Sequence, residues 1–83
     1  MPNSYKMTKV RVYLTLKPSL LDSAGRTVEG ALHKLGYEEV KDVRIGKIVE
    51  IQVEKYEESR VKAMCDKLLA NPVIEDYRFE VAG

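Results

Sequence analysis

The 83-residue sequence is poor in the residue types on which small disulfide-rich and metal-binding proteins depend. It contains one cysteine, one histidine and no tryptophan. A single cysteine excludes an intramolecular disulfide and a multi-thiolate metal site. A small chain without disulfides is most simply cytoplasmic, and residues 1–6 contain no apolar stretch typical of a secretory signal. We therefore expect a cytoplasmic protein.

Excess charge and long apolar runs are also absent. The chain has 14 basic and 13 acidic residues, a net charge of +1, whereas nucleic-acid binders usually carry a clear basic excess. No apolar run approaches the roughly 20 residues that span a bilayer. We expect neither a nucleic-acid partner nor a membrane. The length and the 45% hydrophobic content predict one globular domain over residues 1–83, with 1–7 as a loose N-terminal extension.

What the sequence does contain is a clear order of hydrophobic periods. Residues 8–17 alternate, which predicts a strand with one buried face, and residues 24–35 show the helical period. Alternation returns at 39–45 and 48–55, where Gly46-Lys47 has the form of a type II′ hairpin turn. A second helical period at 57–70 precedes Pro72, and a last strand is predicted at 74–81. The apolar positions of the first helix are Ala24, Val28, Ala31, Leu32 and Leu35.

This β-α-β-β-α-β order predicts an α+β fold, the ferredoxin-like plait. Right-handed crossovers would put both helices on one face of a four-stranded antiparallel sheet. The other face would be open and polar. It would carry charges of both signs with a single tyrosine, a composition that suits a protein partner better than RNA. The residues expected on this open face are Arg11, Tyr13, Thr15, Glu50, Gln52 and Glu54, to which the outer strands would add Asp42, Arg44, Asp76, Arg78 and Glu80.

The residues with reactive side chains form no catalytic, cofactor-binding or metal-binding pattern. His33 lies one helical turn from Glu29, and we interpret it as a solvent-facing helix residue rather than a general base. Cys65 falls on the apolar stripe of the second helix, so we interpret it as a core thiol rather than a nucleophile. We expect no catalytic residue in this chain.

Three stretches resemble the PurS family, the small subunits of phosphoribosylformylglycinamidine synthase. They are Leu21 to Gly25, Asp42 to Lys47, and Cys65 to Tyr77, of which Leu68 to Tyr77 is the most specific. The resemblance runs from about Lys9 to Val81, and Ser23 stands where the family often has proline.

The resemblance implies a non-catalytic subunit of a complex in purine biosynthesis. Such a subunit would bridge a PurQ glutaminase and a PurL synthetase and support ammonia transfer between them. ATP and magnesium would be bound by the synthetase, and no cofactor by this chain. The family also implies self-association as a homodimer or tetramer. Our candidates for contacts with self or partners are Tyr13, Arg44, Lys47, Asn71 and Asp76.

The predicted element order is compatible with two other functions. A regulatory domain of the ACT type would bind a small metabolite at a dimer interface. An acylphosphatase-type enzyme would need an arginine near the first loop and an asparagine on a central strand. Residues 17–21 contain no arginine, and the 48–55 strand has Gln52 but no asparagine, so we rank this enzyme last.

Overall fold

A three-stranded antiparallel sheet forms the centre of the protein. The computed structural model describes residues 7–82, and the sheet order is β2-β1-β3. The strands are β1 Thr8–Leu16, β2 Gly46–Val53 and β3 Glu75–Val81. β1 is central, and its Val10 lies opposite Ile51 of β2 and Val81 of β3. The expected N-terminal extension lies, apart from Met7, outside the described residues.

One face of this sheet holds the apolar core, as the alternation of β1 predicts. Val10, Val12 and Leu14 are buried, and Val61 and Cys65 from the helical segment over the sheet are buried against them. Apolar side chains of the neighbouring strands complete the core at its edges and are partly buried. These edge residues are Val49, Ile51, Val53, Tyr77 and Phe79.

The second helix covers the core face and is not uniform. α2 spans Glu58–Met64 and continues as a π-helical turn, η2, over Cys65–Leu69, which ends before Pro72 as predicted. The Tyr77 hydroxyl donates to Asp66 Oδ1 at 2.7 Å, so η2 is fixed to β3. This hydrogen bond raises the pKa of Tyr77 and lowers the pKa of Asp66.

The predicted four-stranded plait is wrong, because residues 39–45 form no strand and the described residues contain three. The expected hairpin turn at Gly46-Lys47 is also wrong, since Gly46 begins β2 and pairs with Thr15. A Cβ at Gly46 would lie 2.5 Å from the Leu14 carbonyl oxygen. This glycine therefore serves a close strand approach and not a turn.

The first helix, α1, spans Ser23–Lys34, close to the predicted range of 24–35. Gly36 has a φ of 102°. The Tyr37 amide donates to the Leu32 carbonyl and the Gly36 amide to the His33 carbonyl, the two bonds of a Schellman motif.

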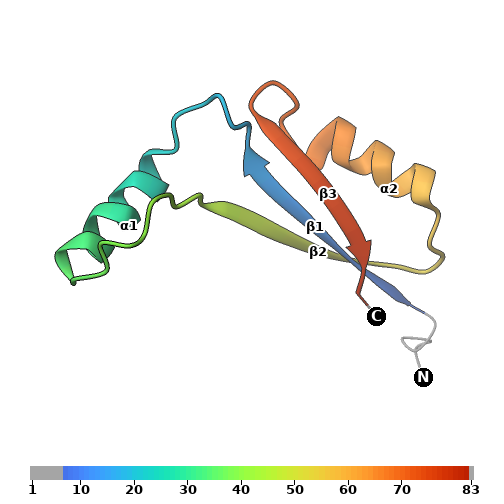
Figure 1. Ribbon diagram of the computed structural model, residues 1–83. Coiled ribbons are helices and arrows are strands. Elements are labelled where there is room, and N and C mark those ends of the chain that lie inside the picture. Colours follow the sequence, from blue (N-terminus) through green and yellow to red (C-terminus); the bar gives the residue numbers. More distant parts are fainter. Residues whose placement is uncertain (1–6, 83) are drawn as a thin grey trace.

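α1 does not cover the sheet, so the expectation of two helices on one face is wrong. Figure 1 shows α1 beyond the end of β1 and β2, while α2 lies over the strands. We call residues 18–45 the arm. The protein measures 51 × 30 × 15 Å with a radius of gyration of 16.8 Å, against about 12 Å for a compact domain of this length. Within residues 7–82, no helix has the length and apolarity to cross a membrane.

Candidate interaction surfaces

The arm leaves and re-enters the sheet at one place, where Asp22 joins its two chain segments. Asp22 is the N-cap of α1 and is only 5% exposed. Its Oδ1 accepts from the Gly25 amide at 2.8 Å, and its Oδ2 accepts from the Ile45 amide at 2.6 Å. These hydrogen bonds, that from Ile45 first, lower the pKa of the Asp22 carboxyl, and the Arg44 charge adds to this effect.

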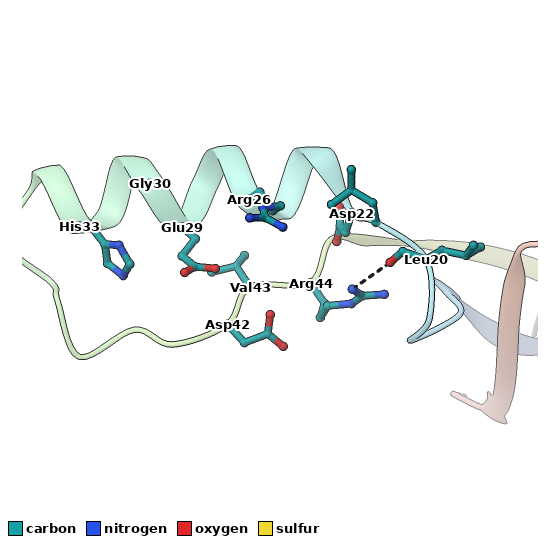
Figure 2. A pocket seen from close by; sticks show the side chains of 10 residues that line it. Leu20, Asp22, Arg26, Glu29, Gly30, His33, Asp42, Val43 and Arg44 are labelled. Carbon is teal, nitrogen blue, oxygen red and sulfur yellow. Dashed lines mark hydrogen bonds between the residues drawn. The ribbon is translucent and has the colours of Figure 1, made fainter.

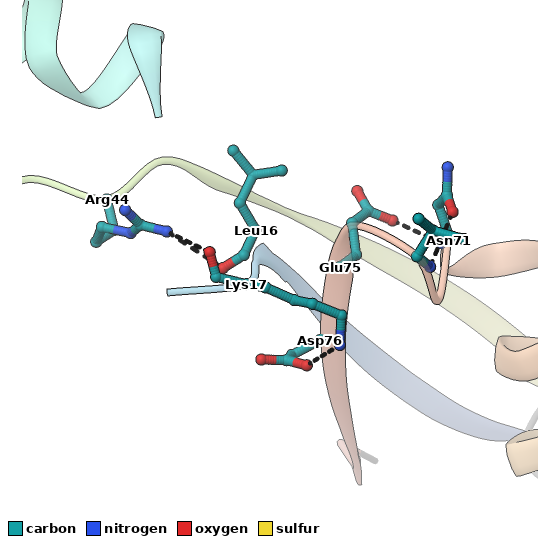
Figure 3. Close-up of polar contacts among 7 residues, drawn as sticks. Leu16, Lys17, Arg44, Asn71, Glu75 and Asp76 are labelled. Carbon is teal, nitrogen blue, oxygen red and sulfur yellow. Dashed lines mark hydrogen bonds and ion pairs between the residues drawn. The ribbon is translucent and has the colours of Figure 1, made fainter. Parts of the chain in front are cut away.

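Arg44 joins the same two segments from the other side. Its guanidinium donates to the carbonyls of Leu16 and Lys17 at 3.3 and 3.2 Å, and to that of Leu20 at 3.5 Å. The contacts to Leu16 and Lys17 are drawn in Figure 3. Arg44 therefore ties the returning arm to the end of β1.

A polar groove of about 490 Å³ lies between α1 and the returning segment. Arg26, Glu29 and His33 extend from the helix toward Asp42 and the residues beside it (Figure 2). His33 is partly buried, with Nε2 2.7 Å from the Val40 carbonyl oxygen. The predicted solvent-facing role of His33 is thus wrong, because its ring binds the segment that follows α1.

Four of the five predicted interface residues lie near the end of the sheet where β1 stops and β3 starts. Lys47 pairs with Glu75 at 3.6 Å, and Asp76 pairs with Lys17 at 3.0 Å. The Asn71 backbone N–H donates to Glu75 Oε1 at 2.8 Å (Figure 3). Arg44 is the fourth. Glu75, which the sequence reasoning did not single out, links Lys47 to Asn71.

The fifth predicted residue, Tyr13, lies on the open face of the sheet. The Arg78 guanidinium carbon lies 3.9 Å from the centre of the Tyr13 ring, and the Tyr13 hydroxyl donates to Glu80 at 2.7 Å. Arg11 Nε pairs with Glu50 at 2.9 Å. The predicted polar face is therefore confirmed for these residues. The sequence showed which side chains share the face, but strand order was needed to place Arg78 on Tyr13.

Large apolar side chains are exposed outside the core. On the arm, Leu35 is 73% exposed, and in and beside the η2–β3 turn Leu68 is 82% and Val73 77% exposed. Apolar side chains that stay in water add no burial free energy to the stability of a monomer. Besides these three, the exposed large apolar residues are Leu21, Val28, Tyr37, Ile45, Ile48, Ile74 and Val81.

Cys65 is inaccessible, which confirms the predicted core thiol. Its side chain is fully buried among the residues of β1 and α2. Burial raises the pKa of the thiol, so the nucleophilic thiolate is disfavoured.

Comparison with known proteins decides the family. The model of the PurS family, described as phosphoribosylformylglycinamidine (FGAM) synthase, matches residues 9–83. The phosphoribosylformylglycinamidine synthase subunit PurS of Bacillus subtilis is 56% identical over 78 residues, which are 90% of this chain and 93% of the relative. The chain belongs to the PurS family.

Solved structures agree with this PurS assignment. A B. subtilis PurS structure matches with a TM-score of 0.81 and 54% identity, covering 92% of this chain and 99% of that one. A chain in the structure of PurLQS from Thermotoga maritima matches with a TM-score of 0.80 and 29% identity, covering 99% and 100% of the two chains. The three-stranded sheet with two helices is therefore the fold of this family, and the protein is a subunit of FGAM synthase in purine biosynthesis.

Proposed function

We propose that this chain is the non-catalytic subunit that joins the glutaminase and synthetase subunits, PurQ and PurL, of FGAM synthase. The observation that carries this proposal is the match of 99% of the chain to a chain in the PurLQS structure. The exposed apolar side chains on the arm and beside the η2–β3 turn give it surfaces that a partner would cover. ATP and magnesium are bound by the synthetase in this proposal, and the cytoplasmic location stays a prediction.

The physical task of such a subunit is to keep ammonia from water. Free ammonia becomes ammonium near neutral pH and is then no nucleophile. A subunit that holds the source and the consumer of ammonia in a fixed arrangement can raise the rate without donating a reactive atom. The buried Cys65 and the carbonyl-bound His33 are consistent with such a role.

We also propose that the chain self-associates through the arm. α1 and its C-cap residue expose Val28, Ala31 and Leu35 to solvent, and these residues lie on one apolar stripe. A second copy offers the same stripe, so a symmetric contact would bury both. Self-association also compensates for the small core of an 83-residue chain.

Reconstitution tests the bridging role. The purified chain is mixed with its PurQ and PurL subunits, and FGAM formation is followed with glutamine and, separately, with ammonium chloride as nitrogen source. We expect no activity from the chain alone, and a glutamine-dependent rate only when all three subunits are present. Synthesis from ammonium chloride should need only the synthetase. A full glutamine-dependent rate without this chain would falsify the proposal.

Sedimentation of the chain alone tests self-association. We expect a dimer or larger species that dissociates on dilution. Leu35→Asp should shift the equilibrium to monomer because it puts a charge into the apolar contact. Lys34→Asp is the matched control, since it adds an acidic residue to the same helix end at a neighbouring exposed position. A monomeric wild type at all concentrations overturns this proposal and leaves the bridging role to the reconstitution.

A further inference from the structure

The base of the arm carries cross-links on both of its chain segments. We propose that Asp22 and Arg44 are positioning residues that form a clasp, which fixes the direction in which the arm leaves the sheet. The consequence for assembly rests on the self-association proposed above. When both sets of hydrogen bonds are formed, α1 faces a second copy in one orientation.

The Asp22 half of the clasp depends on both carboxylate oxygens. Oδ1 caps α1 through the Gly25 amide, while Oδ2 binds the amide of Ile45, the residue immediately before β2. One buried side chain thus connects the start of α1 to the start of a strand. A helix cap needs only one oxygen, so the second bond is not explained by capping.

Gly25 lets the two segments approach closely enough for this bond. A Cβ at this position would overlap the Val43 carbonyl oxygen and the Asp22 carboxylate. The first turn of α1 therefore lies directly against the backbone of the returning segment. This contact explains why a glycine is used in the first turn of a helix.

The Arg44 half of the clasp connects the same two segments in the opposite direction. Its guanidinium extends from the returning segment and donates to the backbone carbonyls of Leu16, the last residue of β1, and of Lys17. Asp22, on the outgoing segment, thus accepts a hydrogen bond from the returning segment. Arg44, on the returning segment, donates hydrogen bonds to the outgoing one. Two cross-links in opposite directions resist rotation about either one.

Orientation matters because α1 is joined to the sheet near its base and extends away from the strands (Figure 1). The helix lies beyond the sheet and does not pack along it (Figure 1). A helix of 12 residues is about 18 Å long, so a swing of roughly 20° at its base moves the far end by about 6 Å. Such a shift would separate the apolar stripe from a partner stripe.

Asp22→Ser separates the clasp from the helix cap. Serine is a good N-cap, but its shorter side chain has one oxygen, which cannot take the positions of both Oδ1 and Oδ2. Spin labels are placed at Lys34→Cys on α1 and Gln52→Cys on β2, with the buried Cys65 unchanged. The labelled chain is diluted with unlabelled chain, so that pulsed electron paramagnetic resonance reports distances within one molecule. Arg44→Gln, at an exposed residue, is the second clasp variant, and Asp42→Ser at a neighbouring exposed carboxylate is the control.

We expect one narrow distance distribution for the wild type and Asp42→Ser, and a broad one for Asp22→Ser and Arg44→Gln. Helix content by circular dichroism should stay unchanged in all four. Self-association should weaken at least tenfold in both clasp variants. Narrow, unshifted distributions in both clasp variants would overturn the proposal. Broad distributions with unchanged self-association would refute the assembly role, whereas a monomeric wild type would refute the self-association itself and leave the distances to judge the clasp.

Discussion

The sheet and the arm use apolar side chains in opposite ways. In the sheet, the apolar residues of β1 face inward and are covered by the α2–η2 segment. In the arm, most apolar residues of α1 are exposed to solvent, and polar cross-links hold the arm at its base. The comparison teaches that the sheet carries the stability of the single chain, while the arm carries a surface that has value only in an assembly.

The largest effect should come from truncating the core of the sheet. Leu14 is 1% exposed and Leu35 is 73% exposed. Leu14→Ala should lower the free energy of unfolding by about 2–5 kcal/mol, because it leaves a cavity. Leu35→Ala should change it by less than about 0.5 kcal/mol in the monomer.

Urea denaturation followed by circular dichroism, at several protein concentrations, checks this pair. Dilution is needed because self-association adds stability that depends on concentration. If Leu35→Ala cost as much as Leu14→Ala in dilute solution, the arm would be packed against its own sheet and the contrast would be lost.

Two glycines of α1 sharpen the contrast within the arm. A Cβ at Gly25 would overlap the Val43 carbonyl oxygen, whereas a Cβ at Gly30 would meet nothing within 4 Å. Gly25→Ala should therefore destabilise by about 1–3 kcal/mol. Gly30→Ala should stabilise by about 0.5–1 kcal/mol, since alanine loses less conformational entropy in a helix. Thermal unfolding of both variants measures these shifts, and equal signs would contradict the close approach at Gly25.

The sheet could be predicted from the sequence more fully than the arm, for a physical reason. The alternation of residues 8–17 predicts one buried face, and in the structure the alternate residues Val10, Val12 and Leu14 are buried on it. Val43 and Ile45 alternate as well, but this segment is held by Asp22 and Arg44 and pairs with no strand. Hydrophobic periodicity cannot distinguish a segment that pairs with a neighbouring strand from one whose backbone is held by side-chain hydrogen bonds.

The residues of the candidate surfaces could be predicted from the sequence only where the alternation within a single strand places them. Tyr13 was placed on the open face by alternation alone. The partners Arg78 and Glu80 depend on which strand lies beside β1, and no local pattern states this. Asp22 caps α1 through a local bond from the Gly25 amide, but its second bond joins residues 23 positions apart.

Acid should loosen the arm before the sheet. Hydrogen bonds from the Ile45 and Gly25 amides lower the folded-state pKa of Asp22 below the value of about 3.9 in an unfolded chain. The stabilisation by Asp22 is therefore fully present above about pH 4 and is lost as the pH falls through the folded pKa. Hydrogen exchange of the Gly25 and Ile45 amides below pH 4 measures the loss, relative to amides of β1.

The matched control for this pH dependence is Asp22→Ser. This variant has no carboxyl at the base of the arm, so the exchange of the Ile45 amide should be fast at every pH after correction for intrinsic rates. Other carboxyl groups titrate in the same range and affect both proteins alike. A wild-type difference between Ile45 and β1 that did not change with pH would show that another group holds the arm.

The smallest effect should come from the ion pairs on the open face of the sheet. Arg11 contacts Glu50 at 2.9 Å and Glu80 at 3.9 Å, and all three side chains are partly exposed. Exposed pairs contribute little because water and salt screen them. Arg11→Gln should therefore leave the urea midpoint of the isolated chain nearly unchanged, and any small loss should vanish in high salt. A large loss of stability that persisted in salt would mean that this face of the sheet is covered in solution. The contact between copies would then involve the sheet rather than the arm.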